Sequence, residues 1–474
     1  MATLRTGDTI AAIATAQGPG AVGIIRLSGP AARALALALF RSSRSTFAGF
    51  KPYRLHHGGL VDANGRALDE VLAAFMPGPG SFTGEDVAEL HCHGGPAVLR
   101  AVLDELLLRG ARLAAPGEFS FRAFKNGKLD LAQAEAIAET IAAPTRAALH
   151  LAQMKLSGAL SQRIGGLRER LEALRAQLCL AVDFPDEDVE CLPPDLLCGE
   201  ALAVAEAVAG LLAGVERARA WREGVLAVLA GRVNAGKSSL MNALVGRNRA
   251  LVSATPGTTR DYIEEQLELS GLLVRLVDTA GLRVGAGETE GADGAGIDPV
   301  EAAGQELARD FMSRAEAVLY VLDAARPLAP QDRQALAELD PGRALVVLNK
   351  CDLPEALAQG GEAHALARSL GLACLSVSAK SGAGLEALCA LLRQRLAGAE
   401  PDPDALAPNA RQAQALRLAQ AELLALADEA QSGLPYDILG LRLDAACRAL
   451  AELVGDIAPD EVLEAIFSRF CIGK

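Results

Sequence analysis

The chain has 474 residues, which predicts roughly two to four domains with ample material for hydrophobic cores. Its formal net charge of −13 excludes binding of nucleic acid by overall charge, so any RNA contact must be local or shared with a partner. Nine cysteines without a CxxC pair or zinc spacing, the lack of a signal peptide and the lack of a charge-free run of about 18 apolar residues predict a soluble, cytoplasmic protein without stable membrane insertion.

Residues 1–121 are predicted to form an α/β domain. Short strand-like runs (VGIIRLS, VLAAFM and VAELHCH) alternate with turns rich in Gly and Pro, and a helix is expected around Ala97 to Arg109.

Two helical segments, 122–219 and 396–474, flank the middle of the chain. Apolar residues recur in each at steps of three and four, which is typical of amphipathic helices. The simplest packing makes one bundle from both segments, with residues 220–395 inserted as a separate domain and 397–410 as the return linker. Two separate helical hairpins are the alternative. The stripes are Leu160, Ile164, Leu167, Leu171, Leu174 and Leu178, and then Leu439, Leu443, Ala446, Leu450 and Leu453.

The stretch GRVNAGKS, Gly231 to Ser238, follows the apolar run VLAVLA and matches the phosphate-binding loop GxxxxGK[ST]. In such a loop, backbone NH groups and a helix N-terminus surround a phosphate, so we expect Lys237 to reach the terminal phosphates and Ser238 to hold Mg²⁺. A simple glycine-rich turn is the alternative, but the partners of a phosphate loop follow in order. They are TPGTTRD, which offers Thr259 as a second Mg²⁺ ligand and sensor of the γ-phosphate, and DTAG, where Asp278 follows a strand-like run and would hold the metal through water.

The motif NKCD, Asn349 to Asp352, closes the apolar run ALVVL and predicts which base is bound. Guanine presents two neighbouring NH donors, and one carboxylate, Asp352, can accept a hydrogen bond from each of them. Adenine does not present this pair of donors. We therefore expect a GTPase domain of the Ras-like type. The expected nucleotide contacts are Asn234, Ala235, Gly236, Lys237, Ser238 and Ser239, then Ser253, Ala254, Thr255, Pro256, Gly257, Thr258 and Thr259, then Asp278, Thr279, Ala280 and Gly281, and finally Asn349 at the base's other edge, Lys350 over its face, Asp352, Ser378, Ala379 and Lys380.

Hydrolysis needs a device other than the glutamine of small GTPases, because Leu282 and Arg283 follow DTAG. An arginine finger or a monovalent cation could neutralise the charge that develops between the β- and γ-phosphates. Asn234 and the oxygens of residues 253–258 suit K⁺. The alternative for Asn234 is a turn residue.

The loops NAGKSS and PGTTRD, the segments SFTGEDVAELHCHGGP, PGEFSFRAF, GKLDLAQAEAI and DFPDED, and the terminal FCIGK together resemble the tRNA modification GTPase family called MnmE or TrmE. The resemblance covers the whole chain. It implies a K⁺-activated, homodimeric GTPase that forms a heterotetramer with an FAD-dependent partner of the MnmG or GidA type. Together they would add aminomethyl or carboxymethylaminomethyl groups to C5 of the wobble uridine of certain tRNAs. The one-carbon donor would be 5,10-methylene-tetrahydrofolate, or a 5-formyl form, bound by the N-terminal domain. FAD is expected on the partner only, because this chain has no GxGxxG fingerprint.

Carried over residue by residue, the resemblance implies three ligand sets. Ser253 stands where threonine is common in the family and keeps the hydroxyl. Without the resemblance, Arg26 and Glu89 would be interpreted as surface charges; a carboxylate such as Glu89 can read the amino and NH edge of a pterin. The sets are Asn234, Ser253, Thr255 and Thr258 for K⁺, Ser238 and Thr259 for Mg²⁺, and Arg26, Glu89, Lys128 and Lys474 for the folate.

Two catalytic residues are expected from the same resemblance. Glu301, in the pattern VExxG that resumes after a Gly-rich insertion at 284–297, would orient the attacking water. Glu288 and Glu290 are the alternatives for this role. Glu301 could instead be an acidic residue on a solvated loop without a catalytic role. Cys471 would belong to the modification centre, in a chemical role that stays open, or would be a packing residue. The acidic stretch 183–188 is either a relay towards the GTPase domain or a solvated helix end.

Two classes of function follow. The first is a tRNA-modifying enzyme whose GTP cycle opens and closes a complex around its substrate. The second is a GTP-gated binding switch, such as a ribosome-assembly factor, without covalent RNA chemistry. The N-terminal motifs and Cys471 favour the first. The sequence leaves open which tRNAs are served and whether ammonium or glycine supplies the nitrogen.

Overall fold

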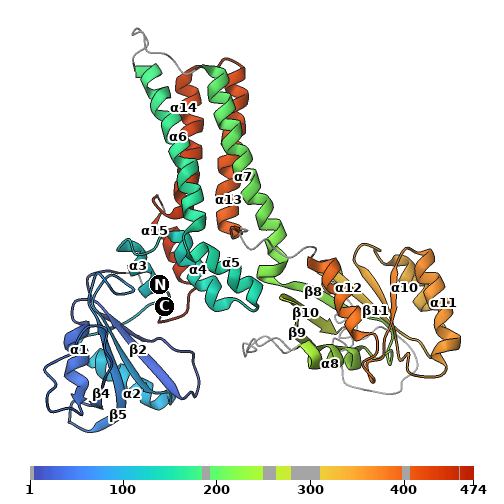
Figure 1. Ribbon diagram of the computed structural model, residues 1–474, viewed down its shortest axis with the longest axis horizontal. Coiled ribbons are helices and arrows are strands. Elements are labelled where there is room, and N and C mark those ends of the chain that lie inside the picture. Colours follow the sequence, from blue (N-terminus) through green and yellow to red (C-terminus); the bar gives the residue numbers. More distant parts are fainter. Residues whose placement is uncertain are drawn as a thin grey trace, which may run out of the picture. The chain divides into compact units, whose positions relative to one another are not determined.

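The computed structural model describes residues 5–183, 193–248, 263–278, 310–397, 406–457 and 459–473. The chain divides into two compact units, which we describe separately. The first is formed by residues 1–139, 155–209 and 409–474, and the second by 140–154 and 210–408. Figure 1 shows the elements of each.

The first unit begins with a seven-stranded sheet in the order β3-β4-β5-β6-β2-β1-β7. Neighbouring strands are antiparallel, except that β7 runs parallel to β1. Helices α1 (Ala32–Leu39) and α2 (Pro96–Leu108) share a hydrophobic core with one face of this sheet. The helix expected around Ala97 to Arg109 is therefore α2. The strands are β1 (Ile10–Ile13), β2 (Val22–Ser28), β3 (Phe40–Ser42), β4 (His56–Val61), β5 (Ala67–Met76), β6 (Val87–His93) and β7 (Arg112–Leu113).

The helices that follow build a bundle from two distant parts of the chain. All six residues of the predicted stripe on α6 and all five on α14 are buried. Helix α14 packs against both α13 and α6, and Arg175 on α6 pairs with Asp444 on α14. One bundle forms, and the alternative of two separate hairpins is wrong. The helices of these parts of the chain are α3 (Glu118–Lys125), α4 (Leu131–Ala142), α5 (Arg146–Leu156), α6 (Ala159–Asp183), α7 (Pro194–Glu223), α13 (Ala410–Gln431), α14 (Tyr436–Val454) and α15 (Asp460–Phe467). The end of α4, most of α5 and α7 from Gly210 onward belong to the second unit.

The start of α13 is fixed by a largely buried ion pair. Asn409 caps the helix in a capping box with Gln412. Arg411 then donates two hydrogen bonds, each 2.8 Å long, to the two carboxylate oxygens of Glu135 on α4, and a third to the carbonyl of Leu453 at the end of α14. Residues 276 positions apart in sequence are thereby joined by a bidentate contact, which is the strong geometry for this pair.

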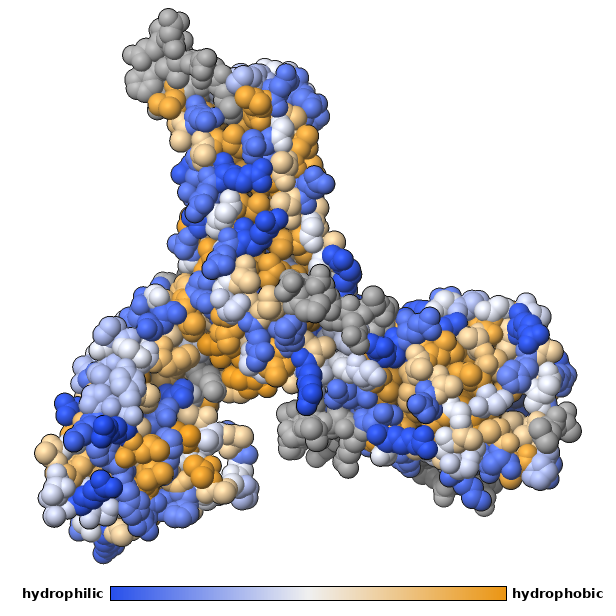
Figure 2. Space-filling view, in the orientation of Figure 1, coloured by the Kyte–Doolittle hydropathy of each residue, from blue (hydrophilic) through white to orange (hydrophobic). Residues whose placement is uncertain are grey.

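Helix α7 is the one helix of the described residues that is long and apolar enough to cross a membrane by length and composition alone. Its buried side chains recur at steps of three and four, for example at Leu197, Ala201, Val204 and Val208. This is the pattern of a helix with one face packed against protein. Figure 2 shows hydrophilic and apolar residues mixed along the visible face of the bundle.

The second unit holds a six-stranded sheet in the order β13-β12-β11-β8-β10-β9. All neighbours are parallel except β9 and β10. Strands β8, β11 and β12 are nearly continuous apolar runs because both faces of the sheet are covered. Helix α5 contributes Leu151 to one of the two cores, beside Trp221. The elements are β8 (Val225–Ala230), α8 (Lys237–Asn248), β9 (Ile263–Leu269), β10 (Leu272–Asp278), β11 (Ala317–Asp323), α10 (Pro330–Glu338), β12 (Ala344–Asn349), α11 (Ala356–Ser369), β13 (Ala373–Ser376) and α12 (Leu385–Ala397).

This topology brings distant polar residues to one edge. The carboxyl ends of parallel strands lie together, and in open α/β sheets ligands bind there. Strand β8 leads into Gly231, β10 ends at Asp278, β11 at Asp323 and β12 at Asn349.

Candidate functional site

The phosphate loop connects β8 to α8, and two of its glycines cannot be replaced without a clash. Gly231 has φ +129° and Gly236 has φ +90°, a region that side chains rarely adopt. A Cβ atom would lie 2.3 Å from the carbonyl oxygen of Val321 at Gly231, and 2.3 Å from Nδ2 of Asn349 at Gly236. The loop therefore packs directly on β11 and on the end of β12.

The residues expected to bind phosphate and Mg²⁺ lie at the start of α8. The Nζ atom of Lys237 donates to the carbonyls of Gly231 and Arg232, both at 2.9 Å, so the ammonium lies over its own loop. The hydroxyl of Ser238 donates to Oδ2 of the fully buried Asp278 at 2.6 Å. A hydroxyl and a carboxylate thus lie side by side, and such hard oxygen donors suit a divalent cation.

Asn349 joins the phosphate loop to the loop of Ser378. Its side chain is buried; Nδ2 donates to the carbonyls of Ala235 and Gly236 at 3.1 and 3.4 Å. Its Oδ1 accepts from the backbone NH groups of Lys350 and Ala379 at 2.8 and 3.0 Å. In this structure the amide therefore holds protein loops together, and the expected contact of Asn349 with the base stays a prediction.

Asp352 presents an accessible carboxylate beside these loops. Its Oδ1 accepts a hydrogen bond of 2.6 Å from the hydroxyl of the fully buried Ser378. This bond, helped by the Asp352 backbone NH and by the charge of Lys380, holds the pKa of Asp352 below its usual value. The group is an ionised acceptor fixed in direction, as recognition of two neighbouring NH donors requires.

The side-chain ammonium of Lys350 contacts two separate segments of the chain. Its backbone has φ +67°, and its Nζ donates to the carbonyl of Asn234 at 2.9 Å and to Oδ2 of Asp323 at 2.7 Å. Asn234 itself has φ +64°, so it serves as a turn residue whatever else it binds. Sequence reasoning missed Asp323, although a carboxylate that ends the apolar run AVLYVLD was visible there.

Several expected residues lie outside the described part of the chain. They are Ser253, Ala254, Thr255, Pro256, Gly257, Thr258 and Thr259, then Thr279, Ala280 and Gly281, then Glu301 with its alternatives Glu288 and Glu290, residues 184–188 of the acidic stretch, and Lys474.

A second group of expected residues meets on the N-terminal sheet. Arg26 on β2 and Glu89 on β6 are directly opposite each other, with Nε and Oε1 2.9 Å apart. The Arg26 guanidinium lies 5.8 Å from the ring centres of Phe82 and Phe119. A hydrogen bond from His91, followed by the charge of Arg26, holds the pKa of Glu89 below its usual range. Lys128 donates to the carbonyl of Pro79 at 3.0 Å, on the loop that also carries Phe82.

The end of the chain lies against the same sheet. Arg26 donates to the carbonyl of Gly473 at 3.4 Å, and the NH of Gly117 donates to the carbonyl of Cys471 at 3.4 Å. Gly473 has φ +91°, and a Cβ there would lie 2.4 Å from the carbonyl oxygen of Ile13. Residue Cys471 is exposed. The structure therefore brings Arg26, Glu89 and the C-terminal segment together.

Two protein-family models together match nearly the whole chain. Residues 9–128 match the family model for the GTP-binding protein TrmE N-terminus, and residues 131–471 match the MnmE helical domain. The tRNA modification GTPase MnmE of Nitratidesulfovibrio vulgaris strain DP4 is 52% identical over 475 residues, which cover 99% of this chain and 100% of that protein. The chain belongs to the MnmE family of tRNA modification GTPases.

Two further similarities have lower sequence identity. The tRNA modification GTPase MnmE of Symbiobacterium thermophilum is 45% identical over 471 residues, covering 98% of this chain and 99% of that protein. The crystal structure of an Aquifex aeolicus Era variant bound to GDP.AlF4- covers 42% of this chain and 66% of that one, at 23% identity and a TM-score of 0.29.

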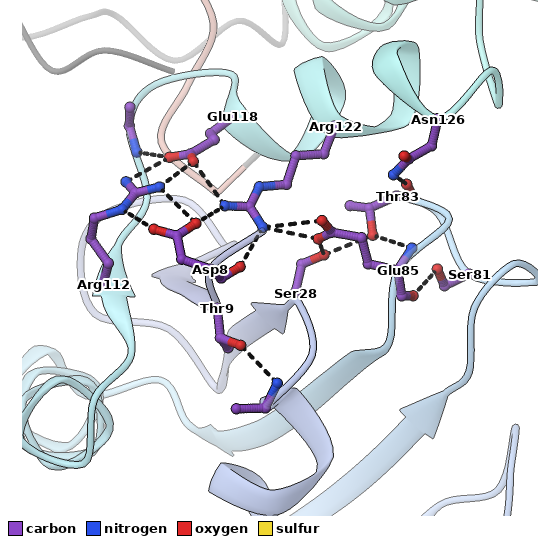
Figure 3. Close-up of polar contacts among 12 residues, drawn as sticks. Asp8, Thr9, Ser28, Ser81, Thr83, Glu85, Arg112, Glu118, Arg122 and Asn126 are labelled. Atoms are coloured by element: carbon purple, nitrogen blue, oxygen red, sulfur yellow. Dashed lines mark hydrogen bonds and ion pairs between the residues drawn. The ribbon is translucent and has the colours of Figure 1, made fainter. Parts of the chain in front are cut away.

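In this member of the MnmE family, the N-terminal part of the chain holds a charge cluster with a fully buried pair at its centre, which the sequence did not reveal. Arg122 and Glu118, both on α3, have fully buried side chains. Figure 3 shows Arg112 and Arg122 directed at Asp8 and Glu118, with Arg122 reaching Glu85 as well. The two guanidinium groups, with the Arg112 hydrogen bond first, lower the pKa of Asp8 to about 2. Because Glu85 follows Phe82 closely, the cluster fixes the loop that faces Arg26.

Proposed function

We propose that this member of the MnmE family is a guanine-specific, K⁺-activated GTPase that drives modification of tRNA. With an FAD-dependent partner of the MnmG or GidA type, it would add an aminomethyl or carboxymethylaminomethyl group to C5 of the wobble uridine of certain tRNAs. The observation that carries the proposal is the match over 99% of the chain to a tRNA modification GTPase, because it includes the N-terminal sheet and the C-terminal segment that a simple switch does not need.

For the nucleotide, the proposal assigns base selection to Asp352, phosphate binding to Lys237 and Mg²⁺ binding to Ser238 and Thr259. The 2.6 Å contact between Ser238 and Asp278 supports the Mg²⁺ assignment. Bound cations would neutralise charge on the phosphates during transfer to water. The chain's own contribution would be to hold the phosphates with the loop NH groups and to orient the water through Glu301. The proposed K⁺ ligands are Asn234, Ser253, Thr255 and Thr258.

For the folate, the proposal assigns Arg26, Glu89, Lys128 and Lys474. An ionised Glu89, held in a hydrogen-bonded pair with Arg26, suits the NH edge of a pterin, and the basic groups suit the carboxylates of its glutamate tail. The two phenylalanine rings near Arg26 offer an apolar wall. Cys471, close in sequence to Gly473 at this site, would take part in the modification.

The proposal divides the chain into a folate-binding domain (1–121), a helical domain in two segments (122–219 and 396–474) and a GTPase domain (220–395). It also includes a homodimer that joins the FAD-dependent partner in a heterotetramer in the cytoplasm.

The test is mass analysis of wobble nucleosides from cells that lack the protein. We expect the C5-modified uridines to disappear, to return with the wild-type gene, and not to return with Lys237→Ala. Unchanged C5-modified uridines in the deleted strain would instead favour the GTP-gated switch and would overturn the tRNA-modification proposal.

A further inference from the structure

Asp323 lies beside the nucleotide site on a rigid support. It ends β11 directly opposite Asn349, which ends the neighbouring strand β12. The NH of Ala324 donates to the carbonyl of Asn349 at 2.8 Å, and the NH of Ala325 donates to Oδ1 of Asp323 at 3.0 Å. The carboxylate is thereby oriented by the backbone, and its side chain is 12% exposed.

The free oxygen of this carboxylate holds Lys350. Nζ of Lys350 lies 2.7 Å from Oδ2 of Asp323 and 2.9 Å from the carbonyl oxygen of Asn234. The ammonium therefore bridges a strand end and the phosphate loop. The other basic neighbour, Arg326, is 3.6 Å away and largely exposed, so it does not replace Lys350.

The bridge joins two positions of unfavourable backbone conformation. Among the described residues other than glycine, positive φ occurs at Tyr53, Asn234, Ser270 and Lys350. Such residues persist where the surrounding structure determines them. Two of these four positions are linked directly by the Lys350 ammonium and the Asn234 carbonyl. Removal of the charge that holds the ammonium would therefore loosen both loops together.

We propose that Asp323 is a positioning residue of the GTP site. By holding Lys350 against the carbonyl of Asn234, it fixes the guanine-reading loop and the phosphate loop in one geometry, so that nucleotide affinity and the response to K⁺ depend on each other. The inference rests on the GTPase function proposed above, since Asn234 is its K⁺ ligand and Lys350 lies at its base site.

The variant Asp323→Asn keeps the size of the side chain and its acceptor for Ala325 but removes the charge. For the full-length protein we expect the Kd for GDP to rise about tenfold, the scale of one lost charge-assisted hydrogen bond. The K⁺ concentration for half-maximal GTP hydrolysis should rise by about threefold or more, while kcat at saturating GTP and KCl changes by less than about twofold.

Asp340→Asn is a matched control. Asp340 also accepts from the NH two residues later, at Gly342, and also pairs with an arginine three residues later, at Arg343. Its side chain is 59% exposed, and no contact with Lys350 is present among the described residues. We expect this variant to match the wild type in GDP affinity and K⁺ response.

A double-mutant cycle separates positioning from general destabilisation. In a Lys350→Met background, Asp323→Asn should change GDP affinity by less than about twofold, because its target is gone. The inference would be overturned if Asp323→Asn still raised the Kd for GDP about tenfold in the Lys350→Met background. It would also be overturned if Asp323→Asn alone behaved like the wild type. If the wild-type protein itself neither bound GDP nor hydrolysed GTP, the proposed function would fail instead.

Discussion

Replacement of Gly236 by alanine tests the closest packing in the phosphate loop. A Cβ atom at this position would lie 2.3 Å from Nδ2 of Asn349, far inside van der Waals contact, at a residue with φ +90°. Asn349 cannot move aside freely, because its amide also donates to Ala235 and Gly236 and accepts from Lys350 and Ala379. The loop, the amide or both must shift.

The cost follows from these contacts. A positive φ costs an alanine about 1–2 kcal/mol. Loss of the two hydrogen bonds that the Asn349 amide donates adds about 0.5–1.5 kcal/mol for each bond. A total of about 3 kcal/mol corresponds to a nucleotide affinity about 100-fold weaker, because the displaced loop carries the NH groups that would bind the phosphates.

Titration calorimetry with GDP on the full-length protein measures this effect. Gly246→Ala is the matched control, since Gly246 lies on α8 with nothing within 4 Å of its Cβ position, and an alanine should be tolerated there. In an Asn349→Ala background the clash is gone, so Gly236→Ala should cost only the backbone strain, about tenfold. Affinity within about threefold of wild type for Gly236→Ala, or equal costs in both backgrounds, would refute the reasoning.

Three further predictions concern the first unit. Glu135→Ala removes the carboxylate that accepts two hydrogen bonds from Arg411, so the free energy of unfolding in urea should fall by about 3 kcal/mol. Glu422→Ala, at a partly exposed pair with Arg442, should lower it much less, and equal losses would contradict this ranking. The pKa of Asp8 is lowered from 3.8 to about 2, so its ion pairs stabilise the fold fully above pH 4 and lose that effect as the pH falls through 2. Asp8→Asn should therefore be less stable than wild type at pH 6, with a difference that shrinks between pH 4 and 2; a pH-independent difference in urea unfolding would argue against it. Gly473→Ala should push the C-terminal segment away from Ile13 and weaken binding of 5-formyl-tetrahydrofolate about tenfold without a change in GDP affinity, and calorimetry that finds both affinities unchanged would count against the proposed folate site.

Most of the fold could be predicted from the periodicity of apolar residues and from the order of the motifs. The stripes from Leu160 to Leu178 and from Leu439 to Leu453 are buried because side chains at steps of three and four must share one helix face. Likewise, a phosphate loop after an apolar run implies a strand followed by a helix, as β8 and α8 are.

Periodicity does not show where helices begin and end, or against which other segment each helix packs. The stretch from Leu131 to Val182 reads as helical, but it divides into α4, α5 and α6, and Leu151 packs with Trp221 in the second unit. The burial of Glu118 and Arg122 could not be predicted from the sequence either. A short helix with charged residues has the pattern of a surface helix until its carboxylate and guanidinium partners are known.

In the GTP site, the motifs identified the residue types and the sheet order determined their contacts. Asp323 meets Lys350 because β11 and β12 are neighbours in the sheet, a fact that no local pattern states. For the same reason, the amide of Asn349 reaches the phosphate loop, which belongs to β8 two strands away.

The most direct test of a guanine-nucleotide site driven by a monovalent cation is GTP hydrolysis by the full-length protein with Mg²⁺, in KCl and in NaCl of equal ionic strength. We predict much faster turnover in KCl. Equal rates in the two salts, or no turnover of GTP in either, would contradict the proposal.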